Sequence, residues 1–149
     1  MTDTARPAND PHPAGPTRRR LPKVGLFLPI IEGTMAGASA SWRDLAAFAQ
    51  RAESLGFDSL WTWDHVYPIV GDHEGPMFEA YTAISALAAT TSRGTIGLMV
   101  GANTFRNPAL VAKMMTTIDH ISGGRAVLGI GAAWFETEHT AFGLEFGSG

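Results

Sequence analysis

Four apolar runs along the chain alternate with stretches in which apolar residues recur every three or four positions. The runs lack the polar alternation of a sheet with one face in water, so we expect parallel strands covered on both faces. They occupy residues 24–30, 58–63, 95–100 and 126–130. Strands that alternate with helices predict an α/β fold with right-handed crossovers.

The stretches between the runs carry signals that begin or end helices. Ser41 and Asp44 have the spacing of a capping box, which satisfies the first turn of a helix, and Gly56 offers a C-cap. Asn107 followed by Pro108 is a second start signal, because proline is tolerated at the first helical position. The predicted helices cover residues 42–55, 77–88 and 108–121.

Two architectures fit four consecutive strand–helix units. A (β/α)8 barrel needs about 250 residues, so this chain of 149 residues would supply about half of one. A doubly wound sheet would be nearly complete at this length. The periodicity alone leaves both open.

The N-terminal segment differs in composition from the rest of the chain. Residues 1–20 hold four prolines and almost no large apolar side chains, which predicts a disordered tail. The arginines at 18–20, the apolar run that follows and the small residues at 38–40 together resemble a secretory signal. Pro29 interrupts its apolar core and Glu32 follows the core at once, so we expect a cytoplasmic protein. No apolar stretch approaches the ~20 residues that span a bilayer.

Charge and cysteine content exclude several kinds of site. The formal net charge of -3 leaves no basic excess for binding phosphates, so nucleic acid is not an expected partner. The absence of cysteine excludes disulfides, thiolate zinc sites, iron–sulfur clusters and a thiol nucleophile.

The loops after the carboxyl ends of the strands carry function in both architectures. The second of these loops begins with Asp64 and His65. His65 could donate or relay a proton near neutral pH, and Asp64 could fix its tautomer or bind a ligand. The structural alternative, in which Asp64 caps the strand end and His65 packs beside it, stays open.

Two further motifs are weak. A second Asp–His pair, Asp72 and His73, suggests metal ligands, but its spacing within a glycine-containing loop does not favour a metal site, and we expect none. Residues 129–131 read Gly-Ile-Gly, the opening of a dinucleotide fingerprint, yet Trp134 occupies the place of the third glycine and no clear helix start follows directly. We expect these glycines to let the strand end approach a flat ring or neighbouring strands closely.

Three segments in order closely resemble the luciferase-like monooxygenase family, above all its branch that uses the deazaflavin coenzyme F420. They are residues 105–113, 119–125 and 128–134. With supporting matches in the first two units, the similarity runs from residue 23 to about residue 146. The resemblance implies a (β/α)8 TIM barrel of bacterial-luciferase type, of which residues 21–149 would form about the first four βα units.

The resemblance also implies where the cofactor ring lies. Family members place it at the carboxyl end of the barrel, against a bulge in the third strand with a non-proline cis peptide. By position this peptide would be Met99–Val100 or Val100–Gly101. Asp64 and His65 match a pair beside the reacting carbon, which makes them the expected catalytic residues, with His65 as proton donor or hydrogen-bond partner. The expected cofactor-binding residues are Asp64, Met99, Val100, Gly101, Ala102, Gly131, Ala132 and Trp134.

Two positions depart from the sugar-phosphate dehydrogenases of the family. Trp134 stands where they have a catalytic glutamate, and Ile69 where they have an aromatic residue, so that substrate is disfavoured. We expect hydride transfer between reduced F420 and an unknown small organic substrate, in a homodimer if the barrel is complete. An FMN-dependent monooxygenase that uses O2 is the alternative, and a half-barrel with only a binding or structural role is a third possibility.

Overall fold

The computed structural model of the chain describes residues 21–30 and 40–147. The tail expected at residues 1–20 and nearly all of the small-residue motif at 38–40 lie outside them. The strands are β1 (Gly25–Phe27), β2 (Ser59–Thr62), β3 (Thr95–Leu98), β4 (Gly101–Ala102), β5 (Ala126–Val127) and β6 (Ile130–Gly131). The helices are α1 (Trp42–Leu55), α2 (Ala80–Thr90), α3 (Pro108–Ser122) and α4 (Glu136–Phe142). Of the helices in these two ranges, none is both long and apolar enough to cross a membrane.

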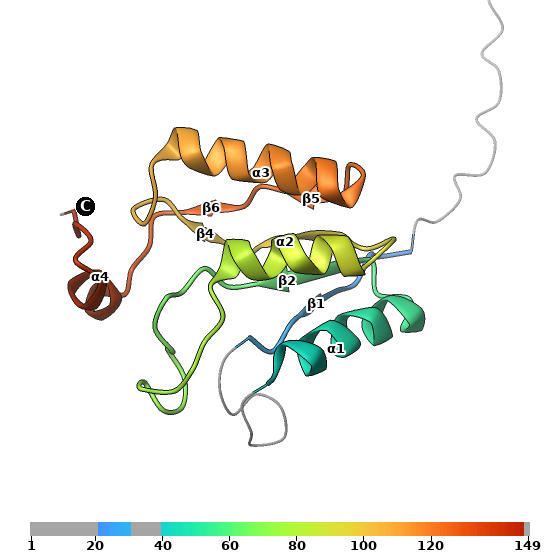
Figure 1. Cartoon of the computed structure of the whole chain (residues 1–149), viewed down its shortest axis with the longest axis horizontal. Coiled ribbons are helices and arrows are strands. Elements are labelled where there is room, and N and C mark those ends of the chain that lie inside the picture. The colour runs from blue at the N-terminus through green and yellow to red at the C-terminus, as the bar shows by residue number, and fades with distance from the viewer. Residues whose placement is uncertain (1–20, 31–39, 148–149) are drawn as a thin grey trace, which may run out of the picture.

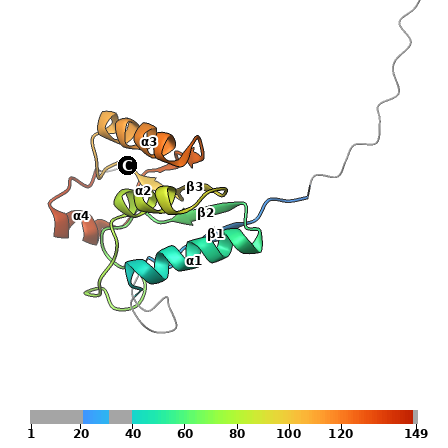
Figure 2. The same cartoon turned by 45° about the vertical axis from the view of Figure 1, so that its right-hand side comes forward.

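The central sheet has the order β1-β2-β3-β5, and every neighbouring pair is parallel. Three helices, α1, α2 and α3, follow its strands and lie along the sheet beside one another (Figures 1 and 2). The core forms where strand and helix side chains meet, and its fully buried members include Leu45, Leu60, Ile84, Ile96 and Ile118. The predicted parallel α/β fold is therefore confirmed.

The predicted helix starts are present with one correction. The Ser41 hydroxyl accepts the backbone N–H of Asp44, and the Asp44 carboxylate accepts that of Ser41, which completes the capping box. The second helix was predicted from residue 77 but begins at Ala80, because the Glu79 carboxylate caps it by accepting two backbone N–H groups. Met77 lies before this cap and still packs against the core.

The third apolar run, which forms β3 and β4, contains a bulge relative to the fourth run, which forms β5 and β6. Gly97 pairs with Val127 and Gly101 pairs with Ile130. Between these two pairs the third run therefore has one residue more than the fourth. The Met99–Val100 peptide within this stretch is cis, which is one of the two positions expected from the sequence. The third and fourth apolar runs each therefore form two short strands, β3 and β4, and β5 and β6.

The helix that follows β6 was not expected. Its N-cap residue, Phe135, makes no side-chain capping bond within the described residues, so the start of α4 has no capping residue in the sequence. Its end is ordinary, because Gly143 adopts the left-handed conformation that closes a helix. Figure 1 shows α4 beyond the end of β6, at the edge of the sheet where the strands finish.

Candidate active site

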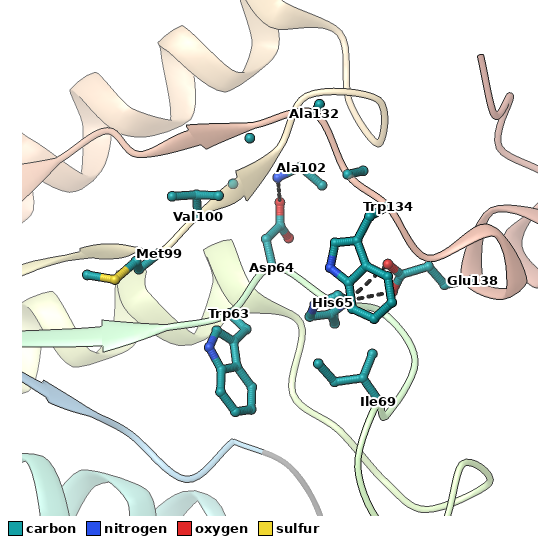
Figure 3. A pocket seen from close by; sticks show the side chains of 13 residues that line it. Trp63, Asp64, His65, Ile69, Met99, Val100, Ala102, Ala132, Trp134 and Glu138 are labelled. Carbon is teal, nitrogen blue, oxygen red and sulfur yellow. Dashed lines mark hydrogen bonds and ion pairs between the residues drawn. The ribbon is translucent and has the colours of Figure 1, made fainter. Parts of the chain in front are cut away.

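A cavity of about 410 Å³ opens at the carboxyl ends of β2, β4 and β6. Its walls come from the loop after β2, the bulge of the third strand and the segment between β6 and α4 (Figure 3). All nine residues expected at the site line this one cavity: Asp64, His65, Met99, Val100, Gly101, Ala102, Gly131, Ala132 and Trp134. The remaining lining residues are Trp63, Ile69, Ala133 and Glu138.

His65 is held by a carboxylate from α4. Its Nδ1 lies 2.9 Å from Oε1 and 3.1 Å from Oε2 of Glu138, and the backbone N–H of Val66 donates to the same Oε2 at 3.1 Å. The His65 side chain is 13% exposed and that of Glu138 only 1%. The imidazole therefore lies in the cavity wall with one nitrogen tied to a buried acceptor.

A second histidine fixes α4 against the rest of the site. His139 is fully buried, and its Nδ1 lies 3.0 Å from the carbonyl oxygen of Phe135. Its Nε2 lies 2.7 Å from the hydroxyl of Thr104, which follows β4. Phe105 and Phe146 pack edge-on against the ring, with centroids 5.0 Å and 4.8 Å away. This contact determines where α4 presents Glu138.

Asp64 is held by a different set of groups from those that hold His65. Its Oδ2 accepts hydrogen bonds from the backbone N–H of Ala102 at 2.8 Å and from Nη1 of Arg106 at 2.7 Å, while its Oδ1 accepts one from Nη2 of Arg106 at 2.9 Å. Asp64 thus ties the chain just after the bulge to the end of β2. The contact to His65 that could fix the imidazole tautomer comes from Glu138 instead.

Arg106 links Asp64 to the second helix. Its Nη2 also donates to the Glu79 carboxylate at 2.6 Å, and its guanidinium lies 4.5 Å from the centre of the Tyr81 ring. Burial alone would lower the pKa of Arg106, but its bonds and charge interactions with Asp64 and Glu79 raise it above the usual value. Burial raises the pKa of Tyr81, and the Asp64 charge raises it further. The cluster behind the cavity therefore keeps a charged guanidinium and a neutral phenol near neutral pH.

Aromatic rings form the open side of the cavity. Trp63 packs on Phe27 at a centroid distance of 5.3 Å, and Trp134 meets His65 edge-on at 6.0 Å. Trp134 is 67% exposed, so it stands at the mouth. A concave site of this size with apolar walls and few polar groups is typical of small-molecule and cofactor binding.

The second Asp–His pair lies outside the cavity lining. His73 Nδ1 lies 2.6 Å from the carbonyl oxygen of Pro68, and its ring stacks on Tyr67. Asp72 accepts the backbone N–H of Glu74 in a turn. In residues 21–30 and 40–147 we find no group of three His, Asp or Glu side chains placed to hold a metal ion.

The sequence reasoning missed two polar residues of the site. Glu138 lies within a few residues of the fourth strand end, where an acidic side chain is a candidate in any barrel. Arg106 lies in a segment that was noted only for its family resemblance. The sequence does not show the partner of either residue. Glu138 contacts His65, 73 residues away, from a helix that was not predicted, and Arg106 contacts Asp64, 42 residues away.

Comparison with known proteins agrees with this geometry. The family described as "Luciferase-like monooxygenase" matches residues 23–148. An F420-dependent glucose-6-phosphate dehydrogenase of Amycolatopsis mediterranei is 40% identical over 106 residues, which are 70% of this chain and 31% of that protein. The pyrimidine monooxygenase RutA of a Bradyrhizobium species is 33% identical over 129 residues, 81% of this chain and 36% of that protein.

A solved structure, an F420-dependent secondary alcohol dehydrogenase with an F420–acetone adduct, has the same fold. It is 28% identical with a TM-score of 0.64, over 74% of this chain and 32% of that one. The chain thus spans about a third of the length of the relatives it matches. The choice left open by periodicity is settled, because the four βα units are part of a luciferase-like TIM barrel.

Proposed function

Because the chain belongs to the luciferase-like monooxygenase family, an oxidoreductase family, we propose that it transfers a hydride between coenzyme F420 and a small organic substrate. Residues 21–149 would form the N-terminal half of the barrel. The observation that carries the proposal is that the bulge, the aromatic wall and His65 border one cavity at the strands' carboxyl ends. Relatives at 40% and 28% identity are F420-dependent dehydrogenases, which favours this cofactor.

The residues present fit a flat ring. The bulge from Met99 to Ala102 and the end of β6, which is paired with it, would together form one wall against the ring. A side chain at Gly131 would clash with Val100, so the close contact between β6 and the bulge depends on glycine. The bound deazaflavin would supply the hydride acceptor or donor.

The protein would supply orientation and the proton. His65 lines the cavity, and within the described residues its Nε2 makes no hydrogen bond. In this role Nε2 takes a proton from a substrate hydroxyl, or returns one to a carbonyl in the reverse reaction. The substrate class we propose is therefore a small alcohol or the matching carbonyl compound.

Cofactor titration tests the choice of F420. We expect F420 to bind the purified full-length protein and an Ala132→Phe variant to weaken that binding at least about tenfold, because Ala132 lines the cavity. Ala109→Phe, an exposed position at the start of α3, is the matched control and should bind as the wild type does. Tight binding of FMN with no affinity for F420 would overturn the proposal.

An FMN-dependent monooxygenase is the second candidate, favoured by the pyrimidine monooxygenase at 33% identity. If this chain had that function, a cavity that excludes water would protect the oxygen chemistry of the reduced flavin. Oxygen consumption that depends on both FMN and substrate would identify it. If the protein binds neither cofactor but forms a stable assembly in sedimentation experiments, the half-barrel with only a binding or structural role would be favoured.

A further inference from the structure

Glu138 is a buried carboxylate whose oxygens face two donors on one short stretch of chain. The donors are Nδ1 of His65 and the backbone N–H of Val66, at 2.9 to 3.1 Å. We infer that Glu138 is a positioning residue that holds His65 with its proton on Nδ1 and the lone pair of Nε2 free for substrate. The inference rests on the proposed function for the identity of the substrate proton, but the tautomer can be observed without cofactor.

The carboxylate determines the tautomer because it can only accept hydrogen bonds. A ring nitrogen at 2.9 Å from it must carry a hydrogen. In the neutral imidazole the other nitrogen, Nε2, is then an acceptor. Figure 3 shows the dashed contacts between Glu138 and His65, which reach Nδ1, and His65 lines the cavity.

Two anchors keep the carboxylate in this place. The backbone N–H of Val66 directly follows His65 in the chain, so its bond to Oε2 fixes Glu138 relative to the His65 backbone. On the other side, His139 is the next residue of α4. Its Nδ1–H donates to the carbonyl of Phe135, which leaves Nε2 to accept the Thr104 hydroxyl. Glu138 is therefore held from both sides before any ligand arrives.

This arrangement matches the needs of alcohol oxidation. The bound deazaflavin, in its oxidised form, would accept the hydride from the alcohol carbon, and Nε2 of His65 would take the O–H proton as the carbonyl forms. His65 then carries a positive charge next to the Glu138 carboxylate, which stabilises it as the acid of a catalytic triad stabilises its imidazolium. The opposite tautomer would present an N–H to the alcohol and could not take its proton.

Glu138→Gln tests the inference, because glutamine replaces one acceptor oxygen by a donor. If the remaining oxygen keeps the Val66 N–H, the amide NH2 faces Nδ1 and the ring proton moves to Nε2. Long-range 1H–15N NMR of the histidine rings, with His65 assigned from a His65→Gln spectrum, reads the tautomer directly. We expect protonated Nδ1 in the wild type, protonated Nε2 in Glu138→Gln, and the wild-type pattern in Glu138→Asp, which keeps two acceptors.

Glu136→Gln is the matched control, since Glu136 is exposed on the same helix. In turnover with F420, Glu138→Gln should lower kcat about 10²-fold with KM within about twofold, as for loss of a positioned base, and the control should match the wild type. If Glu138→Gln does not fold, Glu138→Met removes the acceptor with a side chain of similar length.

An imidazole that keeps its proton on Nδ1 in Glu138→Gln, or in Glu138→Met where Glu138→Gln does not fold, would overturn the inference. A tautomer change in a protein that binds neither F420 nor FMN would keep the inference and refute the proposed function. The two failures are thus distinguishable.

Discussion

The carboxylate of Glu53, on α1, accepts the backbone N–H of Gly94 at 2.6 Å, across the turn that leads into β3. The N–H groups of Ser92 and Arg93 donate to it as well, at 3.0 and 2.8 Å. One buried side chain therefore satisfies three successive backbone donors of a turn that contains no other acceptor for them within the described residues.

This cluster predicts a loss of stability in acid. Burial raises the pKa of Glu53, but the three N–H groups and the charge of Arg125 outweigh it and bring the pKa below its usual 4.5. A carboxyl with a lowered folded pKa adds stability that is complete above pH 4.5 and is lost as the pH falls through the folded value. Glu53→Gln should therefore cost about 2 kcal/mol of unfolding free energy at pH 7.

Urea unfolding at several pH values checks this prediction. The difference between wild type and Glu53→Gln should shrink as the pH falls below 4.5, whereas Glu74→Gln, at an exposed loop position, should show little difference at any pH. A difference that stays constant down to pH 3 would show that the Glu53 charge does not support the turn.

The ion pair between Arg106 and Asp64 predicts a second stability effect. The Asp64 side chain is fully buried and that of Arg106 is 14% exposed, so Arg106→Ala leaves a buried carboxylate with only the Ala102 N–H. Loss of one partner of a buried pair costs about 3–5 kcal/mol. Chemical denaturation should show a loss in this range, and Arg51→Ala, at an exposed position of α1, should change stability by less than about 0.5 kcal/mol. Equal effects in the two variants would contradict the role of the pair.

Local signals in the sequence predicted most of the fold, and long-range partners were what it left out. The capping box at Ser41 and the Asn107–Pro108 start are contained within four residues, and both are present. The predicted start at residue 77 was wrong because the apolar stripe begins before Glu79, the residue that caps the helix. Periodicity cannot detect such a cap. The bulge was placed only through the family resemblance, since an extra residue leaves no mark on an apolar run.

The same division applies to the candidate site. Fold position and family resemblance predicted nine residues that all line one cavity. They could not pair His65 with Glu138, which is 73 residues away on a helix without a capping residue at its start. Their roles in binding and catalysis remain predictions.

The close approach of the segment between β5 and β6 to the end of β3 depends on Gly129. A side chain there would clash with the carbonyl oxygen of Leu98, which is backbone and cannot rotate away. We expect Gly129→Ala to cost about 1–3 kcal/mol, as overpacking does, and to weaken cofactor binding because the bulge lies next to it. Gly147→Ala, with no atom within 4 Å of the added carbon, should have no effect in the same thermal denaturation and binding assays. A Gly129→Ala protein with wild-type stability would show that the strands can separate without cost.

His139 predicts how firmly α4 is attached. Its ring is fully buried between Phe105 and Phe146 and bonds the Thr104 hydroxyl, so it is the principal side chain that fastens this seven-residue helix to the loop after β4. His139→Ala should raise the amide hydrogen-exchange rates of α4 at least tenfold, which corresponds to about 1.4 kcal/mol of local opening free energy. The core strands β2 and β3 should keep their protection, because their side chains pack against α1, α2 and α3 instead. His120→Ala, at an exposed position in the last turn of α3, should leave exchange in α4 unchanged.

Because α4 carries Glu138, the His139→Ala protein should also show a mixture of His65 tautomers. A single His65 tautomer in a protein whose α4 exchanges faster would mean that the Val66 contact alone is enough to hold the Glu138 carboxylate.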